Sequence, residues 1–161
     1  GQEITLIGRQ YHLKFIPVRA NRITGRRKDG VITVEAPEEF LSDRTQVSDA
    51  VPRLINKIFA YDMDQRVRDI NQRTINANIG RVSLKSVVSR WGSCTHENNI
   101  MISNRLLLAP TEILDHVIIH ELAHTVHRDH SRQFWRVVAQ YDSHMKEHNA
   151  WLKLHGHTLK Y

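Results

Sequence analysis

The 161-residue sequence predicts an α+β fold, because strand-like and helix-like patterns occupy separate stretches of the chain. Residues 1–40 are rich in strand-forming residues, residues 48–73 carry an apolar stripe at helical spacing, and residues 79–108 return to strand-like character. Helical patterns follow to the C-terminus. A chain of this length buries about 70% of its unfolded surface and needs no disulfide to fold. We therefore predict a single domain over residues 1–161.

Two N-terminal strand-like runs, "ITLIGRQYHLKFIPVR" and "GVITVEAP", are separated by a basic segment that ends in an Asp29-Gly30 turn signal. We expect an antiparallel hairpin or a small antiparallel sheet here. Residues 1–30 contain seven Lys and Arg against two acidic residues, and so hold most of the net charge of +6. The basic segment Arg19–Lys28 could contact a polyanion such as nucleic acid, or keep an exposed hairpin tip soluble.

A long helix is predicted over residues 48–73, with Ser48 as its N-cap and Pro52 tolerated in its first turns. Residues 79–104 then predict an antiparallel hairpin around a polar turn at residues 97–99, and Pro110 ends the strand-like region. The apolar residues that recur along the long helix are assigned to the core: Val51, Leu54, Ile55, Ile58, Phe59 and Met63.

The C-terminal third predicts three more helices. The first starts at Thr111, a suitable N-cap, and has Asp115 in its early turns. The others are expected near residues 131–141 and 143–155, with Ser131 and Ser143 as caps. The apolar stripe of the first helix is expected to be buried: Ile113, Leu114, Val117, Ile118, Leu122 and Ala123.

The run "HELAHTVHRDH" at residues 120–130 contains an HExxH pattern within the first of these helices. His120 and His124 are one turn apart, about 40° around the helix and about 6 Å along it, so both imidazoles can reach one metal ion. Glu121 can then act on a water at the open position of that metal. The pattern therefore predicts a Zn²⁺ site that activates water.

The third ligand depends on where this helix ends. On an unbroken helix His127 would keep the same face but lie about 10.5 Å along the axis from His120, which is far for convergence on one zinc ion. His130 can reach the ion only if the helix ends soon after His124 and the chain turns back. The weak helix formers Thr125 and Val126, and the turn chemistry of Asp129, allow this ending.

Four short pieces within residues 80–140 together resemble one known family, the YgjP-like metallopeptidase domain, and more distantly the SprT and Wss1-like (WLM) metalloproteases of the zincin group. The resemblance implies a compact zincin-like α+β domain, in which a small antiparallel sheet packs on the HExxH helix and further helices. It also implies zinc-dependent peptidase or hydrolase activity, and His130 as the third ligand. The pieces are "RWGSC" at 90–94, "NRLLLAP" at 104–110, "HELAH" at 120–124 and "HSRQFW" at 130–135.

The predicted mechanism uses Zn²⁺ held by His120, His124 and His130, with water in the fourth position and Glu121 as the general base. A peptide or protein substrate would lie extended along the edge of the 79–104 hairpin. The group that stabilises the oxyanion is left open among four candidates: Arg90, His127, Tyr141 and His144.

Other conspicuous residues receive structural interpretations. Cys94 is expected to pack within the Trp-Gly-Ser-Cys turn, and His116 to be solvated or to support a neighbouring ligand. The three tryptophans are assigned to packing, and the histidines of the C-terminal tail to the surface. These residues are Trp91, Trp135 and Trp151, and His144, His148, His155 and His157.

Two non-enzymatic functions remain as alternatives. One is a nucleic-acid-binding module with a structural zinc, which would use Arg19–Lys28 and would bind in a salt-dependent way. The other is an inactive partner-binding domain, although a structural zinc does not require Glu121. One cysteine, no apolar run of membrane-spanning length and no signal-peptide pattern favour a cytoplasmic protein without a membrane partner.

Overall fold

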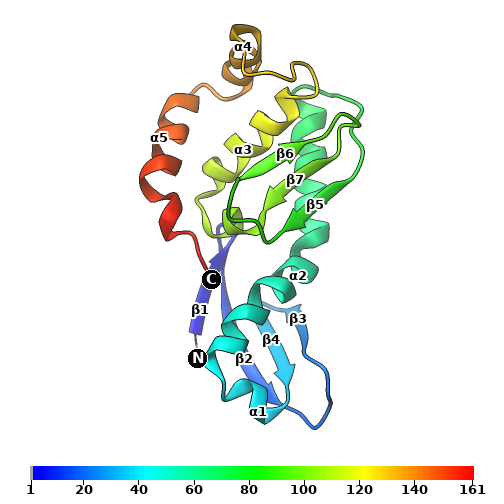
Figure 1. Cartoon of the computed structure of the whole chain (residues 1–161), viewed down its shortest axis with the longest axis vertical. Coiled ribbons are helices and arrows are strands. Elements are labelled where there is room, and N and C mark those ends of the chain that lie inside the picture. The colour runs from blue at the N-terminus through cyan, green and yellow to red at the C-terminus, as the bar shows by residue number, and fades with distance from the viewer. Residues whose placement is uncertain (1) are drawn as a thin grey trace.

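A computed structural model describes residues 2–161 and contains two small sheets with helices packed around them (Figure 1). The α+β prediction is confirmed. The first sheet contains β1 (Gln2–Leu6), β2 (Arg9–Pro17), β3 (Thr24–Lys28) and β4 (Val31–Ala36), and the second contains β5 (Val82–Lys85), β6 (Gly92–Cys94) and β7 (Ile100–Ser103). The α-helices are α1 (Glu38–Leu41), α2 (Arg44–Arg73), α3 (Thr111–Ala123), α4 (Arg132–Tyr141) and α5 (Met145–His155), and the 3-10 helices are η1 (Asn104–Leu108) and η2 (Gly156–Thr158).

The first sheet has the strand order β1-β2-β4-β3 and is mixed: β1 and β2, and likewise β3 and β4, form antiparallel hairpins, but the sheet as a whole is not antiparallel as predicted. β2 and β4 pair in parallel, because the basic segment between them forms a strand of its own, β3. The Asp29-Gly30 turn joins β3 to β4, and both of its residues have positive φ. A second turn of this kind, at Ile7-Gly8, divides the first strand-like run into β1 and β2. Both turns therefore have the φ signs of type I′ hairpins.

The second sheet has the order β5-β7-β6 and is also mixed. β6 and β7 form the predicted antiparallel hairpin, with Asn98 at a φ of 63° in its turn. β5 pairs with β7 in parallel on the other side, which the hairpin prediction did not include. The stretch before Pro110 is the 3-10 helix η1 rather than a strand. β6 is consequently an edge strand of this sheet.

Helix α2 begins four residues earlier than predicted, because Asp43 and not Ser48 is its N-cap. The Asp43 carboxylate accepts hydrogen bonds from the backbone N–H groups of Thr45 and Gln46. α2 runs beside both sheets (Figure 1) and ends at Arg73, as predicted. Its predicted stripe does face the core: Leu54, Ile55, Phe59 and Met63 are buried, and Val51 and Ile58 pack against them.

Helix α3 lies between the second sheet and α5 (Figure 1), and every residue of its predicted apolar stripe is buried. Thr111 is its first residue rather than its cap. Asp115 receives two hydrogen bonds from the guanidinium of Arg66 on α2, at 2.7 and 3.0 Å, instead of serving the helix terminus. This bidentate ion pair fixes α3 against α2.

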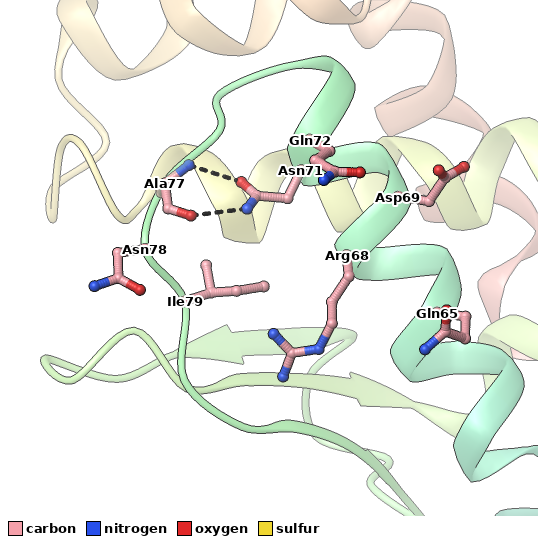
Figure 2. Close-up of a pocket in the computed structure, with 8 residues that line it drawn as sticks. All are labelled: Gln65, Arg68, Asp69, Asn71, Gln72, Ala77, Asn78 and Ile79. Carbon is pink, nitrogen blue, oxygen red and sulfur yellow. Dashed lines mark hydrogen bonds between the residues drawn. The ribbon is translucent and has the colours of Figure 1, made fainter.

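The loop after α2 is held by Asn71, whose side chain is buried. Its amide accepts a hydrogen bond from the backbone N–H of Ala77 and donates one to the Ala77 carbonyl, as Figure 2 shows. Arg68 in the same hollow donates to Asp64 and to the Gly80 carbonyl. These bonds are internal to the chain and set the entry into β5. Within residues 2–161, no helix is long and apolar enough to cross a membrane.

The C-terminal segment is fixed by Arg105, which lies in η1. Its guanidinium stacks over Trp91 at 4.1 Å from the ring centroid and donates to the carbonyls of Val88, Gly156 and Leu159. Gly156 allows this close packing, since a Cβ there would lie 2.6 Å from the Trp91 ring. The arginine thus links η1, the Trp91 loop and the chain end.

Replacing Arg105 by lysine should lower the free energy of unfolding by about 1–3 kcal/mol, because an ammonium cannot reproduce three divergent hydrogen bonds and the planar stacking. Urea denaturation followed by circular dichroism measures the change. The control is Arg73→Lys, which affects an exposed i,i+4 ion pair with Asp69 and should change stability by less than about 0.5 kcal/mol. Equal stabilities of the two variants would contradict the role given to Arg105.

Candidate metal centre

Three histidines converge at the C-terminal end of α3. His120 lies in the last turn of the helix, His124 is its C-cap residue, and His130 precedes α4. One donor nitrogen from each lies within 4.8 Å of the other two. The Nε2 atoms of His124 and His130 are 3.2 Å apart. His127 is not part of this group, although its carbonyl contacts it.

The convergence depends on the end of α3 at Ala123, an ending that the sequence allows. The backbone N–H of His127 closes the last turn on the Ala123 carbonyl, and the Thr125 hydroxyl donates to the Leu122 carbonyl. The chain then reverses before Ser131, which caps α4 as predicted by accepting a hydrogen bond from the backbone N–H of residue 134. The turn at 124–130 therefore brings the last histidine back to the helix.

The hydrogen bond of His124 to the backbone indicates how its ring is protonated. Its Nδ1 lies 3.0 Å from the His127 carbonyl oxygen and can only donate to it. In a neutral ring this leaves the Nε2 lone pair facing the Nε2 atom of His130. Such an orienting bond to a carbonyl is the usual second contact of a metal-binding imidazole. The donor set of nitrogens therefore fits a zinc ion.

Aromatic rings from α4 surround the three imidazoles. Phe134 stacks on His124 with centroids 4.3 Å apart and meets His120 edge-on, while the Trp135 ring lies beside His120 and His130. Burial lowers the pKa of His120 to about 3, and it also lowers the pKa of His124. Both rings are therefore neutral near pH 7, and neutral imidazole is the form that binds metals.

Glu121 is buried, and its side chain lies against Gly92 of β6. A Cβ added at Gly92 would lie 2.9 Å from the Glu121 Cγ and 3.0 Å from its Oε2, so only glycine leaves room for this carboxylate. Burial raises the pKa of Glu121 to about 7, and the charge of Arg90 acts in the opposite direction. A carboxyl with this pKa can accept a proton and release it again.

Arg128 connects the turn at 124–130 to the hairpin, a contact that no sequence pattern predicts. Its guanidinium donates to the Thr95 carbonyl at 2.6 Å, to the His96 carbonyl at 3.2 Å and to the Asn98 side-chain oxygen at 2.6 Å. It also contacts the Cys94 sulfur at 3.6 Å. Burial is the main cause of a raised pKa at that thiol. These contacts fit the packing interpretation of the cysteine.

Two histidines differ from expectation. His116 was expected to be solvated or to support a ligand, but it is 2% exposed and contacts Asp142 and Asn149. His148 was expected on the surface, but its Nδ1 lies 2.9 Å from the same Asp142 carboxylate. The sequence did not reveal this because Asp142 follows α4, 26 positions after His116. The three tryptophans pack against the core as predicted.

The candidates for the oxyanion partner lie in different places. Arg90 precedes β6, and its charge acts on Glu121. Tyr141 is at the end of α4 and accepts a hydrogen bond from its neighbour Gln140, and His144 lies beside the ring of His148. Of the four candidates, Arg90 is thus the one whose charge affects the pKa of Glu121 in the HExxH segment.

Two cations of the basic segment are engaged within the molecule. Arg27 donates two hydrogen bonds to Asp62 and lies over the Phe59 ring, 4.4 Å from its centroid. The bonds to Asp62 are the main cause of its raised pKa. Arg26 pairs with Glu35 on the adjacent strand. These arginines link β3 to α2 and β4, and nucleic-acid binding by the segment is not supported.

Comparison with known proteins gives one family. The model of the YgjP-like metallopeptidase domain matches residues 1–155, so the resemblance inferred from four short pieces is confirmed over nearly the whole chain. Neither the curated proteins nor the solved structures include a match to the sequence.

Substituting Gly92 by alanine should displace Glu121 and lower turnover of a peptide substrate by about tenfold or more, with the metal retained. The added methyl group would contact the buried Glu121 side chain and the backbone carbonyl of Met101, so the free energy of unfolding should also fall by about 1–3 kcal/mol. Metal content and hydrolysis per folded molecule are the measurements.

The control is Gly80→Ala, whose added Cβ would lie 2.2 Å from the Asn99 side chain, away from the histidines. It should reduce stability but leave turnover per folded molecule unchanged. Normal turnover in the Gly92 variant would show that the position of Glu121 does not depend on this glycine.

Proposed function

Since the chain belongs to the YgjP-like metallopeptidase domain family, we propose that it is a zinc-dependent peptidase whose ion is held by His120, His124 and His130. The convergence of three imidazole nitrogens within 4.8 Å carries this proposal. Three nitrogen ligands leave one position of a tetrahedral ion open, which is the arrangement of catalytic rather than structural zinc. Residues 80–140 are the catalytic part of a single domain, and residues 1–40 form a supporting sheet.

Zinc bound to these histidines would lower the pKa of a water molecule and polarise the substrate carbonyl. Glu121 removes the proton from the attacking water and delivers it to the leaving amine nitrogen. Its carboxyl group is suited to this exchange because burial brings its pKa to about 7. The Phe134 and Trp135 rings keep the ligand imidazoles in place and exclude water around them.

The substrate we propose is an extended peptide or protein segment. β6 is the edge of its sheet and packs against α3, so an extended chain could pair with it and cross the centre. Gly92 places this edge next to Glu121, and Arg128 holds the adjoining turn. We also propose a cytoplasmic location, which rests on the single cysteine, Cys94, and its free thiol.

Glu121→Gln should retain zinc and reduce hydrolysis by about 10²–10⁴-fold, since an amide cannot accept the proton of water. A mixed peptide library digested with each protein and read by mass spectrometry measures the loss. Glu112→Gln, at an exposed position on the same helix, is the control and should cleave like the wild type. The mechanism fails if the Glu121 variant also cleaves at the wild-type rate.

His130→Ala should weaken zinc binding by about 10²-fold or more, because one of three ligands is lost. His127→Ala should change the affinity by less than about threefold, since only the backbone carbonyl of that residue orients His124. Competition with a chromophoric chelator gives both affinities. The opposite ranking would make His127 the third ligand.

A further inference from the structure

A second cluster of metal-binding side chains lies one turn earlier along α3, outside the centre proposed above. It joins His116 on α3, Asp142 at the C-cap of α4 and His148 on α5, and one ligand atom from each lies within 4.8 Å of the others. His116 and Asp142 are 2% and 7% exposed. Both imidazoles direct Nδ1 at the same carboxylate, His116 at Oδ2 and His148 at Oδ1.

The second nitrogen of His116 suggests what this cluster binds. Its Nε2 lies 3.0 Å from the side-chain oxygen of Asn149 and donates a hydrogen bond to it. The Nδ1 of the same ring faces a carboxylate oxygen, which only accepts, so either a proton or a metal ion must lie between these two atoms. His124 has the same arrangement in the first centre, with one nitrogen on a carbonyl oxygen and the other facing a second ligand.

We propose that His116, Asp142 and His148 form a second metal site, which takes a divalent first-row transition ion such as Zn²⁺. Two imidazoles and one carboxylate are a common ligand set for zinc and for other ions of this series. The partners of the Asp142 carboxylate are two imidazoles, so a divalent ion would also compensate its buried charge. The His148 side chain is 16% exposed, which leaves the ion a route from solvent.

The ion would serve a structural role. His116 lies one turn before His120, about 6 Å along the helix axis, and the other two ligands come from the end of α4 and from α5. Metal bound there would fix α4 against α3. Since α4 follows His130 directly and carries Phe134 and Trp135, the second ion would hold the segment that completes the first centre.

Zinc stoichiometry after loading and desalting tests this proposal. The wild type should retain two equivalents per chain, His148→Ala one, and the double variant His124→Ala/His130→Ala one. Adding His148→Ala to that double variant should remove the last equivalent. The control is His144→Ala, an exposed histidine beside His148, which should retain two. His148→Gln keeps the side-chain bulk and separates loss of a ligand from loss of packing.

A thermal scan gives a second readout that does not require catalysis. Zinc should raise the Tm of the His124→Ala/His130→Ala variant, and this increase should vanish when His148 is also replaced. If the wild type binds one ion and the double variant none, a proton rather than a metal ion lies within the second cluster, and the proposal is wrong. It is also wrong if His148→Ala retains two. If the double variant keeps the one ion that the wild type binds, the second site stands and the proposed peptidase centre fails.

Discussion

The end of α3 at Ala123 is the constraint on which the proposed centre depends. On a continuous helix His130 would lie about 15 Å along the axis from His120, and three imidazoles could not meet. The turn that follows starts with local hydrogen bonds: the N–H of His127 closes the last helical turn, and the Thr125 hydroxyl donates to the Leu122 carbonyl at the helix terminus. Ser131 then starts α4 in a new direction. The ligand set is therefore a product of helix termination.

The proposed centre also requires that the turn at 124–130 keeps a fixed position relative to the edge strand β6. Arg128 provides the link, because its guanidinium binds two carbonyls and one side-chain oxygen of the β6–β7 turn. Gly92 provides the close approach on the other side, where Glu121 packs against the strand. A shift of the hairpin would thus move Glu121, the proposed general base, together with the edge strand proposed to bind substrate.

Sequence reasoning succeeded where the determining interactions are local. The spacing of His120 and His124, the helix end after them and the Ser131 cap depend on residues within a few positions of each other, and so does the β6–β7 turn. It failed where two nearby residues could serve equally well as a helix cap, or where the interacting residues lie far apart in the sequence. Asp43 and Ser48 are both good caps for α2, and the parallel pairing of β2 with β4 requires the inserted strand β3. The partners of Arg128 are 30 or more residues away.

Both histidine clusters along α3 share one electrostatic property. In each, an imidazole nitrogen faces another potential ligand atom: Nε2 of His124 faces Nε2 of His130, and Nδ1 of His116 faces the Asp142 carboxylate. Burial lowers the pKa of His120 and His124, so these rings are neutral near pH 7 and offer lone pairs to a cation. A metal ion between the facing atoms would bind them as ligands. Metal binding should therefore stabilise the turn at 124–130 itself, so that the order of this turn depends on whether the proposed site holds a metal ion.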